Sequence, residues 1–202
     1  MPSQRLVCAV CLRPQRSCIC QWITSVAHAT EVLILQHPLE VDHAKNSARL
    51  LHLSLPHSRI VIGETFDEGA LATAMQVPKY TMLLYPPTPH DVAPAIDPAS
   101  LLDCAQLRLV VLDGTWRKSR KMLHLSPLLH QLPRLQLHDV PASSYLIRKA
   151  HQPGQLSTLE ATCAALAQLE GDAAKFQPLL QAFDGFVAQQ LAFRPATTGL
   201  IG

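Results

Sequence analysis

The segment Leu107-Arg-Leu-Val-Val-Leu-Asp113-Gly-Thr-Trp116 joins an apolar run to a short polar loop, and it indicates the fold class of the chain. Its branched apolar residues are typical of a strand that is buried on both faces. The run ends in a carboxylate, a glycine, a hydroxyl and an indole. Because ligands of open α/β sheets collect at the carboxyl ends of strands, Asp113 is a candidate reactive group.

Strand-like and helix-like segments alternate on both sides of this segment. We expect strands at residues 31–36, 58–63, 80–85, 107–112 and 135–138. We expect helices at residues 42–53, 115–125, 157–169 and 175–192. Ser157 and Glu160 have the spacing of a capping box at the start of the third helix. The alternation predicts an α/β fold, with a mainly parallel sheet and helices on both of its faces.

The composition fits a globular protein of one domain with a small appendage. The chain has 202 residues, of which 48% are hydrophobic. No apolar run approaches the ~20 residues that span a bilayer, and the N-terminus lacks the apolar core of a signal peptide. We therefore expect a cytoplasmic protein with no membrane partner. We divide it into a cysteine-rich head, residues 1–25, and a catalytic α/β domain, residues 26–202.

Charge is segregated along the chain although its formal net charge is only +2. Residues 108–149 hold eight Lys and Arg against two Asp, and residues 1–20 hold three Arg and no acid. The rest of the chain is therefore net acidic. Such segregation suggests a polyanionic partner for the basic part, although a solvated helix face would explain it equally well.

The head contains Cys8-x2-Cys11-x6-Cys18-x-Cys20, four thiols within thirteen residues. Two close pairs joined by a short loop can surround a tetrahedral ion, and thiolates suit zinc. Disulfides are disfavoured without a secretion signal, and a redox dithiol at Cys8 and Cys11 lacks the usual flanking strand and helix. Scattered core cysteines are also disfavoured, because we expect this segment to have no core that they could occupy. The pattern predicts a structural zinc knuckle.

The tetrapeptide Asp113-Gly-Thr-Trp116 resembles the D-x-T-W signature of the DTW-domain family. Further strings resemble family motifs in order and spacing, over about residues 8–190. They are the cysteine quartet, Leu35-Gln-His-Pro-Leu-Glu40 with Asn46-Ser47, Leu84-Tyr-Pro86, Ser144-x-x-x-Arg148-Lys149 and Leu156-Ser-Thr-Leu-Glu-Ala161. Two departures are visible: the family usually has Asn-Thr at positions 46–47, and it often has proline directly after the Arg-Lys pair.

The resemblance implies a bacterial-type tRNA-uridine aminocarboxypropyltransferase. Such an enzyme moves the 3-amino-3-carboxypropyl group of S-adenosylmethionine to N3 of a uridine, here expected at position 47 in the variable loop of tRNA, and releases 5′-methylthioadenosine. The family is related to the SPOUT methyltransferases, so the resemblance also implies a C-terminal knot. Two alternatives stay open: a SPOUT-like RNA methyltransferase that uses the same donor, and a zinc-containing RNA-binding protein without catalysis.

The expected roles of the site residues follow from this chemistry. The N3 imide reacts only once its proton leaves, and Asp113 is the candidate general base; the alternative is an N-cap for the following helix. Trp116 either stacks on a base or anchors the helix in the core. The remaining candidate contacts with S-adenosylmethionine are Tyr85, Pro86, Leu112, Gly114, Thr115, Ser144 and Arg148.

The candidate RNA contacts are His37, Glu40, Asn46, Arg117, Arg120, Lys121 and Lys149. Arg117 can share a helix face with Arg120 or Lys121 and so form a phosphate-binding pair. Arg148 and Lys149 could hold either the methionine carboxylate of the donor or a tRNA phosphate. Surface salt bridges are the alternative for these cations, and a structural role is the alternative for His37. Asn46 and Glu40 either bond within their own loop or approach the nucleotide.

Overall fold

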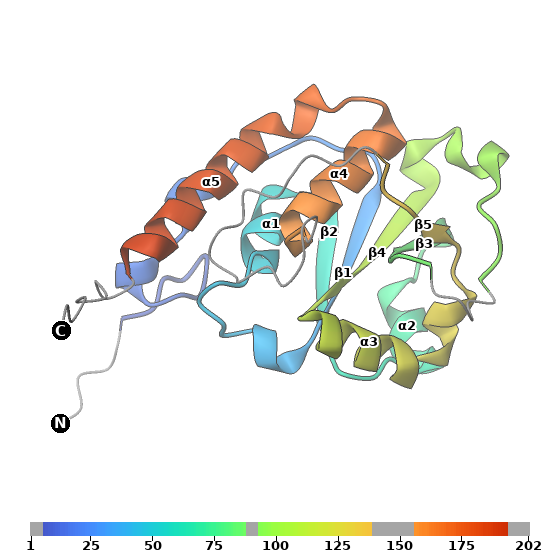
Figure 1. Ribbon diagram of the computed structural model, residues 1–202, viewed down its shortest axis with the longest axis horizontal. Helices are drawn as coiled ribbons and strands as arrows, with labels where there is room; N and C mark the ends of the chain where they lie inside the picture. Colours follow the sequence, from blue (N-terminus) through green and yellow to red (C-terminus); the bar gives the residue numbers. More distant parts are fainter. Residues whose placement is uncertain (1–5, 88–92, 139–155, 194–202) are drawn as a thin grey trace, which may run out of the picture.

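The protein is an α/β sandwich in which a parallel five-stranded sheet lies between two layers of helices (Figure 1). The computed structural model describes residues 6–87, 93–138 and 156–193. The strand order is β2-β1-β4-β3-β5 and every neighbouring pair is parallel. The strands are β1 (Glu31–Gln36), β2 (Ser58–Ile62), β3 (Tyr80–Leu84), β4 (Leu107–Asp113) and β5 (Arg134–Leu135). The predicted α/β fold is confirmed.

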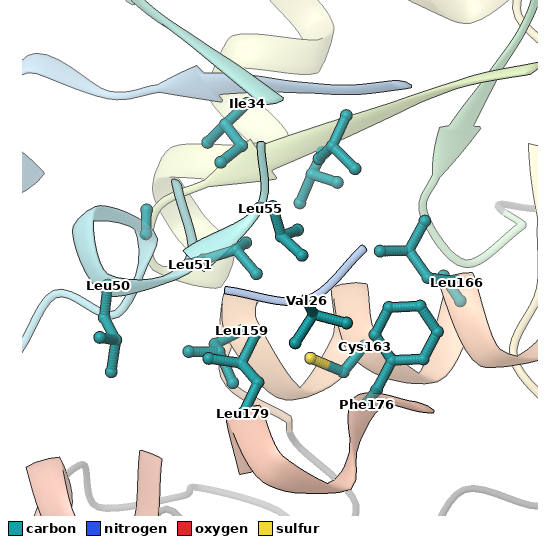
Figure 2. Packing of buried hydrophobic residues seen from close by; sticks show 14 of the residues in the cluster. Val26, Ile34, Leu50, Leu51, Leu55, Leu159, Cys163, Leu166, Phe176 and Leu179 are labelled. Carbon is teal, nitrogen blue, oxygen red and sulfur yellow. The ribbon is translucent and has the colours of Figure 1, made fainter. Parts of the chain in front are cut away.

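The helices divide between the two faces of the sheet. They are α1 (Ala48–Ser54), α2 (Glu68–Ala74), α3 (Trp116–Leu125), α4 (Thr158–Glu170) and α5 (Gln177–Ala192). Side chains of α1, α4 and α5 form one core cluster with alternate residues of β1 and β4, which Figure 2 shows around Val26, Ile34 and Cys163. The other residues of these strands pack with α2 and α3. Both faces of β4 are therefore buried, as its continuous apolar run predicts.

Three helix predictions need correction. The first helix begins at Ala48 rather than at residue 42, because residues 41–47 form turns, from which Asn46 bonds to Asp113 at the end of β4. The sequence analysis missed α2, whose Asp67 accepts a hydrogen bond from the Ala70 amide as N-cap. Its seven residues make only about two turns, and their alanines and glycine carry little hydrophobic periodicity. The last helix begins at Gln177, after a short 3-10 turn.

The Ser157–Glu160 capping box is present at the start of α4, and Gly171 ends that helix in the left-handed conformation. Within the residues that the structure describes, no helix is long and apolar enough to cross a membrane.

Candidate functional site: a tethered carboxylate at the carboxyl edge of the sheet

Asp113 is the last residue of β4, and three side chains from three other segments hold its carboxylate. The amides of Gln36 and Asn46 donate to Oδ2 at 2.9 and 2.6 Å, and the hydroxyl of Thr158 donates to Oδ1 at 2.7 Å. The side chain is only 2% exposed. All three donors are neutral, so they fix the orientation of the carboxyl group without placing a charge beside it.

This carboxylate lies where the chain leaves two neighbouring strands in opposite directions. Gln36 and Asp113 are register partners at the carboxyl ends of β1 and β4. From β1 the chain runs through α1 to β2 on one side of the sheet, whereas from β4 it runs through α3 to β5 on the other. Such a switch point is the usual ligand site of an open parallel sheet.

Asp113 is not the N-cap of α3, so that alternative is wrong. The cap is Thr115, whose hydroxyl accepts a bond from the Lys118 amide. The amide of His37 instead donates to the backbone carbonyl of Asp113. A Cβ atom on Gly114 would lie 3.1 Å from the Lys118 Cβ, so the glycine permits a close approach of strand end and helix.

Two groups of ion pairs connect the segments that follow β1 and β2 to α3. Lys118 donates to buried Glu40 at 2.8 Å, and Lys121 donates to Glu64 at 3.0 Å. The other oxygen of Glu64 is 2.9 Å from Nε2 of His37. Hydrogen bonds from Lys121 and His37 lower the pKa of Glu64. His37 and Glu40 are therefore buried residues whose pairs with Glu64 and Lys118 stabilise the site. This agrees with the alternative of a structural role for His37.

Trp116 is 47% exposed at the start of α3, so the alternative of a core indole is wrong. Its ring meets the ring of Tyr85 edge-to-face, with 5.9 Å between centroids. The guanidinium of Arg134 lies 5.7 Å from the Tyr85 ring on the β5 side. Tyr85 is buried, whereas Trp116 presents a free aromatic surface next to the carboxyl edge of the sheet.

The basic segment predicted from the sequence is not one surface. Arg108 is buried and pairs with Glu31 at the opposite end of β4, and Arg134 is also buried. Lys118 and Lys121 are paired with acids, as described above. Of the basic residues of α3, Arg117 and Arg120 are exposed and project from one helix face, three positions apart.

The four cysteines of the head converge as the spacing predicts. Their sulfur atoms all lie within 4.8 Å of one another, with 3.5 Å between Cys8 and Cys20 and 3.7 Å between Cys11 and Cys18. Tetrahedral zinc thiolates at ~2.3 Å require sulfur separations of about 3.8 Å, so the quartet fits this ion. Backbone amides of Cys11 and Val10 lower the pKa of Cys8 to about 6, whereas burial raises that of Cys20 to about 12.

The head packs against α5 and against the main core (Figure 1). Cys11 and Ile19 are buried in the cluster that covers one face of the sheet, so this segment does have a core to occupy. Trp22 donates to Gln189 at 2.6 Å, and its ring lies where a Cβ on Gly185 would be, 2.1 Å from the nearest ring atom. Glycine in the middle of α5 therefore makes room for the indole of the head.

Of the other predicted site residues, three lie near the end of the sheet and three lie outside the described residues. Pro86 and Thr115 are exposed near the sheet edge. The side chain of Leu112 belongs to the core beneath α2 and α3, so only its backbone faces the site. Ser144, Arg148 and Lys149 lie outside the described residues.

Sequence analysis missed Gln36 and Thr158 as partners of Asp113. Gln36 could have been predicted as a partner of Asp113. It ends a predicted strand, and it lies in register with Asp113 if the two strands are neighbours. Thr158 was assigned only to a helix start, and nothing in the sequence places that helix over β4. Arg13, which connects the head to residues 44–46, carried no signal beyond its charge.

Comparisons with known proteins agree with this geometry. Similar proteins include tRNA-uridine aminocarboxypropyltransferase 2 of Drosophila melanogaster, 32% identical over 84% of this chain and 68% of the fly protein. The mouse protein of that name is 29% identical over 93% of this chain and 64% of its own length. An Arabidopsis thaliana relative, tRNA-uridine aminocarboxypropyltransferase A, is 27% identical over 84% of this chain and 74% of its own length.

This chain thus spans about two thirds to three quarters of the length of these relatives. No solved structure matches it significantly. The DTW domain pattern matches residues 5–191, which include the cysteine quartet, Asp113 and Thr158. The chain belongs to the DTW-domain family.

Proposed function

We propose that this protein is an enzyme that modifies tRNA by transferring the 3-amino-3-carboxypropyl group of S-adenosylmethionine to N3 of a uridine. The relatives named above are tRNA-uridine aminocarboxypropyltransferases, and the family pattern covers nearly the whole chain. When bound, the donor supplies an electrophilic carbon next to its sulfonium, and 5′-methylthioadenosine is the leaving group. We retain uridine 47 of the variable loop as the predicted target, and the cytoplasm as the predicted compartment.

The observation that carries the proposal is the tethered carboxylate at the switch point. The new bond joins N3 to the transferred carbon, so the N3 proton must move to a base. Two donors occupy Oδ2 of Asp113, whereas among the described residues only Thr158 bonds to Oδ1. We assign the N3 proton to Oδ1, which retains acceptor capacity. The fixed orientation of the carboxylate would contribute by positioning it for proton transfer.

In this proposal some residues around Asp113 contact S-adenosylmethionine and others contact the RNA. Tyr85, Pro86, Gly114 and the backbone of Leu112 face the same edge as the carboxylate and would contact the donor. Trp116 would stack on a base or on the adenine of the donor. We retain Thr115, Ser144 and Arg148 as predicted donor contacts.

The tRNA would approach over the exposed face of α3. Arg117 and Arg120 are its strongest candidates for phosphate contacts, since both are exposed and near the site. Lys121 contributes less, because Glu64 already balances its charge. His37, Glu40 and Asn46 are buried, so we assign them to shaping the pocket around the nucleotide. Lys149 is retained as a predicted RNA contact.

The cysteine quartet would hold structural zinc. Backbone N–H groups that donate to Cys8, and sulfur separations near those of a tetrahedral site, both support this assignment. No open coordination position is needed for the reaction above. In this proposal the head is a segment stabilised by the metal, and the catalytic domain contains the sheet. The two parts share one hydrophobic core.

The C-terminal knot is also part of the proposal. The chain must return from edge strand β5 to the centre of the sheet, where Thr158 of α4 meets Asp113 of β4. That return path contains residues 139–155, which lie outside the described residues.

The small-molecule product tests the reaction directly. Purified protein is incubated with S-adenosylmethionine and unmodified tRNA, and the reaction is analysed by mass spectrometry. We expect 5′-methylthioadenosine together with aminocarboxypropyl-uridine. S-adenosylhomocysteine with methylated RNA would instead identify a methyltransferase, and tRNA binding without either product would identify a non-catalytic RNA-binding protein.

A further inference from the structure

Arg13 connects the cysteine knuckle to the site through contacts that neither motif requires. Its backbone belongs to the knuckle: the Cys8 amide donates to the Arg13 carbonyl, and the Leu12 amide donates to the Cys8 carbonyl. Leu12 adopts a left-handed conformation with φ of 57°, the only non-glycine residue of the described part to do so. The position of Arg13 is therefore determined by the same turn that carries Cys8 and Cys11.

The side chain of Arg13 extends from this turn to the loop that precedes α1. Nη1 donates to the Ala44 carbonyl at 2.5 Å, and Nη2 donates to the Asn46 carbonyl at 2.8 Å. The guanidinium also lies 5.3 Å from the ring of Phe186 on α5. A planar guanidinium fixes two carbonyls at once, which a lysine ammonium cannot do with the same geometry.

The loop that Arg13 holds is the one that supplies Asn46 to the carboxylate. Residues 41–47 form turns without helix or strand, and residues 41–44 are exposed. Asn46 is buried, donates to Asp113 at 2.6 Å and accepts from the Ala48 amide at 3.0 Å. A loop with so little regular structure depends on side-chain tethers for its position.

We propose that Arg13 is a positioning residue. Fixed by the metal knuckle, it holds the loop of Asn46 in place, and Asn46 in turn orients the carboxylate of Asp113. The proposal rests on the function proposed above and deepens it. It gives the cysteine quartet a second role: the knuckle stabilises the head, and it also sets the orientation of the reacting group. Loss of the Arg13 side chain then impairs catalysis while leaving metal content and tRNA binding intact.

A double-mutant cycle tests this coupling. Arg13→Met keeps the apolar stem and removes both hydrogen bonds, and we expect kcat to fall about 10- to 100-fold with the KM for tRNA changed less than about threefold. If Arg13 acts through Asn46, Arg13→Met with Asn46→Ala should be no slower than Asn46→Ala alone. Arg13→Lys should recover part of the rate. Independent, multiplicative losses in the double variant would overturn the coupling.

Two further measurements and a control variant distinguish a positioning role of Arg13 from general damage to the protein. Zinc content should stay at the wild-type level, and hydrogen exchange should accelerate at residues 44–48 of Arg13→Met in the absence of substrate. Arg16→Met is the matched control, because Arg16 is an exposed arginine of the same head, and it should match wild type in both rate and exchange. Unchanged exchange at residues 44–48 would also contradict the inference. If Asn46→Ala and Asp113→Asn retain full activity, the assignment of Asp113 as the base fails, and if the wild-type protein forms neither 5′-methylthioadenosine nor aminocarboxypropyl-uridine, the proposed function itself fails, whatever Arg13 does.

Discussion

At the scale of single residues, the site combines one buried acid with one exposed aromatic ring. Asp113 is fixed by Gln36, Asn46 and Thr158, whereas Trp116 contacts the ring of Tyr85 edge-to-face and is 47% exposed. The two ends of the D-x-T-W signature thus have opposite environments. The acid is positioned by the protein, and the indole is available to a ligand.

Trp116→Ala should weaken substrate binding without destabilising the protein. Because the ring is 47% exposed, we expect the free energy of unfolding to change by less than about 1 kcal/mol, while the KM for tRNA or for the donor rises. Denaturant unfolding and steady-state kinetics measure both quantities. Trp22→Ala is the control: that ring packs between head and α5, so its loss should cost about 3 kcal/mol. An equal loss of stability in both variants would refute the exposed-ring assignment.

At the scale of elements, strand patterns were easier to predict from the sequence than loops and helix contacts. The first four strands lie within one residue of their predicted bounds, because a parallel sheet requires continuous apolar runs, whereas β5 ends three residues before its predicted end. The start of α1 and the whole of α2 were mispredicted. Their local sequences are weak, and contacts such as those of Asn46 and Phe66 determine where the chain turns.

For the candidate site, the sequence predicted several of the residues but not the contacts between them. The acid, the cysteines and the exposed arginines follow from residue type and spacing. Which donors reach Asp113 depends on strand order and on the path of α4, and neither is encoded locally. Trp116 was ambiguous because an indole at the start of a helix fits core and surface equally.

Gly185→Ala in α5 should destabilise the protein, although alanine normally stabilises a helix. The added Cβ would lie 2.1 Å from Trp22, so the head must shift. We expect a loss of about 1–3 kcal/mol in the free energy of unfolding, typical of overpacking. Gly69→Ala in α2 is the control, since only one atom comes within 4 Å and then at 3.6 Å. It should be neutral or slightly stabilising. Stabilisation by Gly185→Ala would show that the head does not dock on α5 as described.

At the scale of the whole molecule, the cysteine knuckle, α5 and the sheet share one hydrophobic core. The head shares its core with β1 and β4, and Arg13 extends from it to the loop beside Asp113. Stability and activity should therefore depend together on metal content and on buried ionisable groups.

Cys18→Ser should lower zinc content below one ion per chain and reduce the melting temperature, because metal binding and folding are linked. Metal analysis and thermal unfolding measure this, and a chelator should have the same effect on wild type. Cys104→Ser, outside the quartet, should retain the metal. Full zinc retention in Cys18→Ser would exclude the quartet as the site.

Stability should fall as the pH is lowered from about 7.5 to 5.5. Burial lowers the pKa of His28, whose Nε2 accepts a bond from the His57 amide. Below the ordinary pKa of about 6.5 the unfolded chain binds a proton that the folded chain resists, so stability is present above that pH and is lost below it. His28→Gln should flatten this dependence in denaturant unfolding, whereas exposed His124→Gln should not. An unchanged slope in His28→Gln would disprove the assignment.

The central claim is that the Asp113 carboxylate takes the proton from N3 during aminocarboxypropyl transfer, and the single-turnover rate of Asp113→Asn tests it most directly. Asparagine keeps the shape of the side chain but is not a base, so we predict a rate about 10³-fold below wild type with tRNA affinity changed only a few-fold. Asp103→Asn, an exposed acid before the other end of β4, should transfer at the wild-type rate. Transfer by Asp113→Asn within a few-fold of wild type would contradict the account.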